Sequence, residues 1–207
     1  MLEYMRLGGS IMWVIASLSV LALSVIIERL VFYHRASTDP EALETAFGKA
    51  VASKDIDECR SIVRSSNSSM HRLFAVAFAH WGIAREDMKL LVEQQVRREI
   101  YRWERNLYIL ELVGKLAPLL GLLGTVLGMV EMFQSLHVGG QISAASVTGG
   151  IWKALFTTVA GLTVGIPTIF IHGLLVSRID NEEETLNRGA DFLIREHFAN
   201  PAKNETK

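Results

Sequence analysis

Three long apolar segments constrain this chain more than any other feature of its sequence. Residues 11–27 and 154–177 contain no charged side chain, and helices of these lengths, at about 1.5 Å per residue, cross most or all of a hydrocarbon layer of roughly 30 Å. A third segment is uncharged only over residues 116–130. It spans the layer if Lys115 extends to one interface and Glu131 finds a partner near the other. The sequence therefore predicts an all-α integral membrane protein with three transmembrane helices.

The first apolar segment has an alternative interpretation as a signal peptide, because Arg6 precedes it. The segment is longer than a usual signal-peptide core, and no small-x-small cleavage site follows it. Its helical pattern also continues through residues 28–32. We therefore expect a retained first transmembrane helix.

The placement of lysine and arginine predicts the orientation of the chain. None of its 21 basic residues lies in residues 136–150, the loop expected between the second and third spans. Those nearest the membrane lie at the other ends of the segments: Arg29, Arg35, Arg97, Arg98, Arg102, Arg105, Arg178 and Arg188. Because basic residues gather on the cytoplasmic side, the N-terminus is predicted to be outside and the C-terminus inside.

These two observations divide the chain into consecutive segments. The predicted segments are an outer N-terminus (1–9), transmembrane helix 1 (10–33), a cytoplasmic helical insertion (34–106), transmembrane helix 2 (107–135), an outer loop (136–150), transmembrane helix 3 (151–177) and a cytoplasmic C-terminal helix and tail (178–207).

The cytoplasmic segments carry helix signals of their own. Residues 38–41 predict a helix start with Asp39 as cap and Pro40 as first residue. Residues 65–69 form a polar break, and the apolar residues that follow, 70–81, should pack against other helices. From about residue 86 a long helix is expected to run directly into the second span, and the tail helix is expected to continue the third.

Other kinds of chemistry have little support in the sequence. The six histidines lack metal-ligand spacing, and Cys59 has no second cysteine to pair with. We expect no metal, no cofactor, no enzymatic activity and no nucleic-acid partner. The cytoplasmic histidines and the acidic run Glu182-Glu183-Glu184 are expected to be solvated surface.

Small residues recur at helical spacing in the second and third spans, on one side of each helix. They are Gly114, Ala117, Gly121, Gly124, Thr125 and Gly128 in the second, and Ala154, Thr157, Thr158, Gly161, Gly165 and Thr168 in the third. We expect these faces, together with Pro118, to pack closely, and Pro167 to free a carbonyl that a hydroxyl can satisfy. Helix packing alone is the simpler explanation of the glycines.

The threonines Thr125, Thr157 and Thr158 lie midway along antiparallel helices, so they can reach one depth. They would form polar rings if several subunits surrounded an axis. The alternative is that each hydroxyl bonds back to its own helix and has no role in conduction.

Glu131 and Lys153 are predicted to form an ion pair. They lie about 9 Å and about 7.5 Å outward of Thr125 and Thr158, at 1.5 Å per residue. Either charge alone near the outer boundary of the bilayer would be costly. The alternative is that both side chains extend independently to the outer surface.

These patterns resemble the ExbB/TolQ/MotA proton-channel family of bacterial inner membranes. The resemblance covers essentially the whole chain and rests on APLLGLLGTVLGMVEMF in the second span, GIWKALFTTVAGLTVGIP in the third and IERL at the end of the first. Three spans and this length are similar to the ExbB/TolQ branch.

The resemblance implies a ring, pentameric in that family, around helices of an ExbD- or TolR-like partner whose aspartate carries the proton. Proton flow would then drive motion passed to a TonB- or TolA-like envelope protein, with the N-terminus in the periplasm. Thr125 and Thr158 match the pore-facing threonines of the family. The alternative function is a non-conducting membrane scaffold that assembles and stabilises partner proteins.

One residue departs from the family pattern. Many ExbB and TolQ proteins carry glutamate in the GI-x-E-AL motif, where this chain has Lys153. Either the partner's aspartate suffices, or Glu131 supplies the carboxylate from the adjacent helix, or the coupling differs. We favour the first, because a hydroxyl-lined path with one carboxylate on the partner is sufficient for protonation and release.

Overall fold

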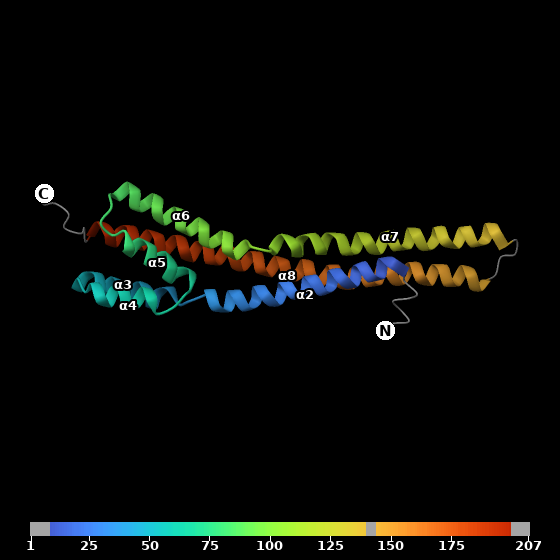
Figure 1. Cartoon of the computed structure of the whole chain (residues 1–207), viewed down its shortest axis with the longest axis horizontal. Coiled ribbons are helices and arrows are strands. Elements are labelled where there is room, and N and C mark those ends of the chain that lie inside the picture. Colours follow the sequence, from blue (N-terminus) through green and yellow to red (C-terminus); the bar gives the residue numbers. More distant parts are fainter. Residues whose placement is uncertain (1–8, 140–143, 200–207) are drawn as a thin grey trace. The chain divides into compact units, whose positions relative to one another are not determined.

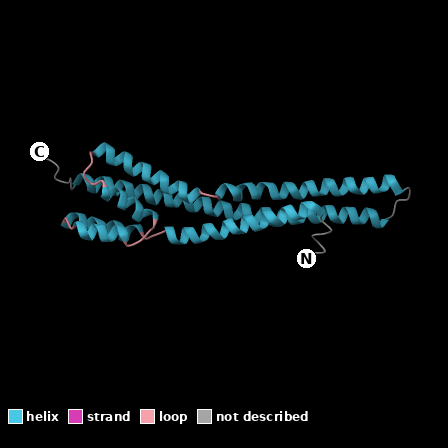
Figure 2. Ribbon diagram, viewed as in Figure 1, coloured by secondary structure: helices cyan, strands magenta, loops and turns pink. Residues whose placement is uncertain are grey.

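The computed structural model describes residues 9–139 and 144–199, and within these ranges it is helical, with no strand (Figure 2). The helices are α2 (Gly9–Ala36), α3 (Pro40–Ser53), α4 (Ile56–Arg64), α5 (Ser69–Ala79), α6 (Arg85–Glu104), α7 (Leu107–Gly139) and α8 (Ala144–Ala199). Three helical stretches, which contain the three apolar segments, are long and apolar enough to cross a membrane. The prediction of an all-α protein with three such helices is confirmed.

The chain divides into two compact units, and the long helices α2 and α8 each contribute to both. The first unit comprises residues 1–28 and 106–175, and the second comprises residues 29–105 and 176–207.

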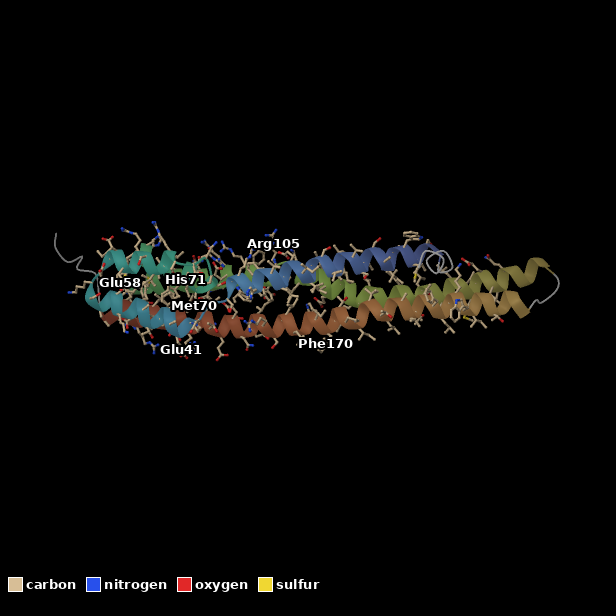
Figure 3. The ribbon with its side chains drawn as sticks, turned by 90° about the horizontal axis from the view of Figure 1, so that it is seen from below. Glu41, Glu58, Met70, His71, Arg105 and Phe170 are labelled. Atoms are coloured by element: carbon tan, nitrogen blue, oxygen red, sulfur yellow. The ribbon has the colours of Figure 1, made fainter. Side chains whose placement is uncertain are left out.

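In the first unit, α7 and the first half of α8 run antiparallel and side by side (Figure 1). Gly150, near the start of α8, meets Met132 late in α7, while Ile169 further along α8 meets Gly114 early in α7. The side chains that point away from this pair are large and apolar, and Phe170, labelled in Figure 3, is 67% exposed. A surface of this kind suits lipid or another membrane helix.

The second unit is a small helical bundle with an apolar core. The core is built from α3, α4, α5, α6 and the last part of α8, and its fully buried members are Phe47, Ala50, Leu73, Phe74, Ala77, Val92, Leu186 and Leu193. Phe47 meets Phe74 edge to face, with ring centroids 5.1 Å apart. The predicted packing of the apolar stretch after the polar break is confirmed by the burial of Met70, Leu73 and Phe74.

Local helix signals worked well in this bundle. Asp39 accepts hydrogen bonds from the amides of Glu41 and Ala42 at 3.1 and 3.4 Å, and Pro40 is the first residue of α3, as predicted. The polar break separates α4 from α5, where Ser68 caps the new helix through the amide of His71. The tail helix continues the third span without interruption, because α8 extends to Ala199.

The predicted continuous helix from residue 86 into the second span is wrong. The chain breaks between α6 and α7 at Asn106, whose φ is +66°. Asparagine tolerates this left-handed conformation better than most residues, and its side-chain amide donates to Glu28 Oε2 at 3.3 Å. In the second unit, Arg29 donates to the carbonyls of Arg102 and Trp103 at 3.0 and 3.4 Å and so caps the end of α6.

The expectation of solvated cytoplasmic histidines and acids is also partly wrong. His71, His197 and Glu182 are buried, at 6%, 7% and 8% exposed, whereas Glu183 is exposed. Burial lowers the pKa of His71 and, as the largest cause, raises the pKa of Glu182 to about 7. These side chains lie on the core stripe of their helices, where a charge is costly.

Glu182 shares its surroundings with a second buried carboxylate, Glu99, which is fully buried. Glu99 accepts hydrogen bonds from Arg72 at 2.5 Å, from Gln95 at 2.8 Å and from Arg102 at 2.9 Å. Its charge is thus compensated by donors from α5 and α6, as a buried carboxylate requires. Glu182 accepts no such hydrogen bond within the described residues.

Candidate functional site

The contact between α7 and α8 is so close that it leaves no room for a Cβ atom at the glycines in its middle. A Cβ atom on Gly161 would lie 2.4 Å from the carbonyl oxygen of Ala117, and one on Gly121 would lie 2.8 Å from that of Thr157. A Cβ on Gly124 would lie 2.4 Å from Thr157 Oγ1. The two backbones therefore touch along this seam, as the small-residue spacing suggests.

The other residues expected at this contact extend the seam in both directions. Pro118 lies against Gly165, where a Cβ would meet its ring at 2.5 Å, and Gly128 lies against Ala154. Pro167 lies within α8, and the adjacent Thr168 hydroxyl donates to the carbonyl of Val164 at 2.7 Å.

Two neighbouring threonines of α8 meet one backbone carbonyl of α7. Thr158 Oγ1 lies 3.2 Å from the oxygen of Gly121, and Thr157 Oγ1 lies 3.3 Å from the same oxygen. Thr157 also lies 2.8 Å from the carbonyl of Ala154. The carbonyl of Gly121 is accessible because Gly121 has no side chain. Sequence reasoning singled out the hydroxyls but not this acceptor.

The three predicted pore threonines differ in exposure. Thr157 is 1% exposed and lies inside the contact of α7 with α8, so its position suits helix packing. Thr158 and Thr125 are half-buried, and Thr125 donates to the carbonyl of Leu122 in its own helix at 2.6 Å. Of these three threonines, Thr125 and Thr158 are the two that keep exposed surface beside the seam.

Glu131 and Lys153 lie in contact across α7 and α8, where Lys153 Nζ donates to Glu131 Oε2. The Lys153 side chain is 27% exposed and that of Glu131 is 62% exposed. Gly9 of α2 lies beside the Lys153 side chain. A Cβ atom on Gly9 would lie 3.5 Å from Lys153 Cε. The cation therefore already has a carboxylate partner in the same subunit.

Reversing either charge of this pair is expected to weaken the outer ends of α7 and α8. Glu131→Lys or Lys153→Glu alone places like charges together and should lower the free energy of unfolding by about 1 kcal/mol, a modest value because Glu131 is exposed. The double exchange should restore the thermal midpoint of the detergent-solubilised protein. If it gives the sum of the two single losses, the pair does not contribute to stability.

Within the described residues no group of histidine, cysteine or acidic side chains is arranged to hold a metal ion. The candidate site is accordingly the seam itself, with hydroxyls at mid-helix and an ion pair near one end. Such a site offers hydrogen-bonding groups at mid-helix and a paired cation near one end. The residues described there do not bring a nucleophile, a base and an orienting group together.

Comparison with known proteins identifies a family whose matched region includes this helix pair. Residues 65–188 match the MotA/TolQ/ExbB proton channel family. The chain is 33% identical over 180 residues to the putative biopolymer transport protein ExbB-like 1 of Synechocystis sp., covering 84% of this chain and 70% of that protein. It is 33% identical over 120 residues to the biopolymer transport protein exbB1 of Vibrio cholerae, covering 56% of this chain and 51% of that protein. It is 40% identical over 76 residues to the ExbB of Helicobacter pylori, covering 37% and 52%.

Proposed function

This chain belongs to the MotA/TolQ/ExbB proton channel family, and from that premise we propose that it is the ring-forming subunit of an inner-membrane proton channel and motor. The motor converts proton-motive force into mechanical work on an envelope partner. The family is a channel and transport family and not a known enzyme family.

The proposed complex has further parts. The chain spans the bacterial inner membrane three times, with the N-terminus in the periplasm and the C-terminus in the cytoplasm. Subunits form a pentamer around an ExbD- or TolR-like helix whose aspartate binds the proton, and a TonB- or TolA-like protein receives the motion. The absence of basic residues from 136–150 supports this orientation.

The observation that supports conduction best is the pair of half-buried hydroxyls beside a tightly closed helix contact. Thr158 and Thr125 offer hydrogen bonds in an otherwise apolar segment. A partner carboxylate that must lose and regain a proton at this depth needs such groups, because an apolar wall would leave it without hydrogen bonds.

The Lys153–Glu131 contact supports a path with its carboxylate on the partner. Lys153 replaces the family glutamate, and Glu131 is already engaged in neutralising it. We therefore assign both residues to holding α7 and α8 together, and the titrating carboxylate to the partner.

Proton flux into liposomes tests this proposal. In vesicles that contain the chain and its ExbD-like partner, Thr158→Val and Thr125→Val should each reduce flux about tenfold, the effect of one lost hydrogen bond worth about 1.4 kcal/mol in the barrier. Thr163→Val is the matched control, because Thr163 is exposed on α8 and its hydroxyl donates to the carbonyl of Val159 in its own helix.

The outcomes separate the two functions considered. Flux that requires the partner and falls in both variants but not in the control supports the channel. Undiminished flux in the variants places the proton path elsewhere. An assembled complex without flux at any pH gradient favours the non-conducting scaffold.

A further inference from the structure

The last turns of α6 carry a concentrated basic surface. Four arginines and one tyrosine line a single hollow, which we call the arginine hollow: Arg97, Arg98, Tyr101, Arg102 and Arg105. The residues recur at one- and three-residue steps and therefore share one face of the helix. Tyr101 is 74% exposed, so the hollow also contains a solvent-accessible aromatic ring next to the guanidinium groups.

The described residues neutralise these charges only in part. Arg98 and Arg105 form no ion pair within the described residues, and Arg97 reaches Glu93 only at 3.9 Å. Arg102 contacts Glu99, but that carboxylate is already paired with Arg72 at 2.5 Å. The hollow therefore holds an excess of positive charge with donors directed at solvent, and Figure 3 shows the Arg105 side chain pointing away from the ribbon.

Chain connectivity places the near end of the hollow at a membrane surface. Arg105 is separated from the first residue of α7, Leu107, by Asn106 alone. If Glu131 marks the outer boundary, a hydrocarbon layer of roughly 30 Å ends about 20 residues earlier, near Glu111. Leu107, the first residue of α7, then lies about 6 Å beyond that boundary, within the headgroup region. Arg105 is joined to Leu107 through Asn106 alone, so its long side chain can reach lipid headgroups.

We propose that the arginine hollow binds the phosphate headgroup of an anionic phospholipid, phosphatidylglycerol or cardiolipin, in the inner leaflet. Guanidinium groups bind phosphate oxygens through paired hydrogen bonds, and basic pockets on the cytoplasmic side of membrane helices bind such headgroups. The proposal rests on the orientation in the proposed function, and it adds a ligand that the proton path does not require.

Lipid binding to the full chain in a neutral detergent tests this directly. The purified protein is titrated with phosphatidylglycerol, cardiolipin or phosphatidylcholine, and bound lipid is counted by native mass spectrometry. Arg98→Gln with Arg105→Gln should weaken binding of both anionic lipids at least tenfold, since each basic residue contributes about 1 kcal/mol. Phosphatidylcholine binding should not change. These two arginines are chosen because neither supports a buried carboxylate.

Two matched variants sharpen the result. Arg60→Gln with Arg64→Gln removes the same charge from exposed positions on α4 and should leave lipid affinity unchanged. Arg98→Lys with Arg105→Lys keeps the charge but removes the guanidinium fork, so it should recover only part of the affinity.

Three results would overturn the proposal. They are equal affinity of the native chain for neutral and anionic lipid, an equal loss in the α4 control, and displacement of the lipid by millimolar inorganic phosphate, which would indicate a soluble ligand. A fourth contradicting result is a change of oligomeric state without a change in lipid affinity, which would assign the hollow to contacts between copies. The lipid-binding measurement does not depend on proton flux. It can therefore be interpreted even if the chain does not conduct protons.

Discussion

Gly161→Ala is expected to destabilise the protein by about 2 kcal/mol or more, the cost of forcing atoms into a filled core. The added Cβ would lie 2.4 Å from the carbonyl oxygen of Ala117 and 3.1 Å from the Cα of Gly121. Both neighbours are backbone atoms, so neither can rotate away as a flexible side chain would. The thermal midpoint of the detergent-solubilised protein should fall accordingly.

Gly173→Ala supplies the matched control in the same helix. A Cβ at Gly173 meets no atom within 4 Å, and alanine favours a helix over glycine by up to about 1 kcal/mol. This variant should therefore be neutral or slightly more stable. Equal midpoints for the two variants would show that α7 and α8 separate easily and that the seam does not hold the subunit together.

The sequence predicts the faces of this seam but not its register. Glycines at helical spacing indicate that two backbones meet, and Gly121, Gly124 and Gly161 all lie at the contact. Thr157 and Thr158 are adjacent in the chain and differ by about 100° around the helix, so small rotations of α8 decide which of them is buried. Only the packed structure shows that Thr157 is the buried one.

The break at Asn106 depends on a partner that is distant in the chain. Asparagine is a weak signal for a helix end compared with glycine or proline. The end of α6 is stabilised instead by Arg29, whose guanidinium reaches the carbonyls of Arg102 and Trp103. These residues are 73 and 74 positions away, so no local pattern marks the site.

The burial of Glu182 in α8, by contrast, can be predicted from its spacing in the sequence, although the neighbouring glutamates suggest an exposed segment. Ile179, Glu182, Leu186, Leu193 and His197 are buried at steps of three, four and seven residues, which is the spacing of one helix face. A run of three glutamates suggests a solvent-exposed segment. The helical spacing of the apolar residues, however, places Glu182 on the buried face and its two neighbours on the exposed face. Periodicity was the better guide here than local charge.

Glu182→Gln is expected to raise the free energy of unfolding at pH 8 by at most about 3 kcal/mol. Burial, the largest cause, raises the pKa of Glu182 from 4.5 to about 7, and a difference of this size corresponds to about 1.4 kcal/mol per unit of pKa. Arg178 of α8 and Arg72 of α5 oppose the rise, and Glu99 of α6 adds to it. Glutamine keeps the size and polarity of the side chain without requiring a proton.

The sign of the pH dependence follows from the raised pKa. Below pH 4.5 Glu182 is protonated in both folded and unfolded chains, so the variant should have no advantage there. Between pH 4.5 and about 7 the folded chain retains a proton that the unfolded chain has lost, so the native protein becomes less stable as pH rises. Above about pH 7 the advantage of the variant should be complete and constant.

Glu183→Gln removes the same charge from an exposed neighbour and separates this mechanism from a general charge effect. Thermal unfolding of both variants and the native chain, measured from pH 4 to pH 8.5, should show the pH-dependent gain for Glu182→Gln alone. A constant gain would mean that the side chain is destabilising for reasons other than its charge. A loss at pH 8 would mean that the ionised carboxylate is held favourably by Arg72 and Arg178, so that these guanidinium groups outweigh the cost of burial.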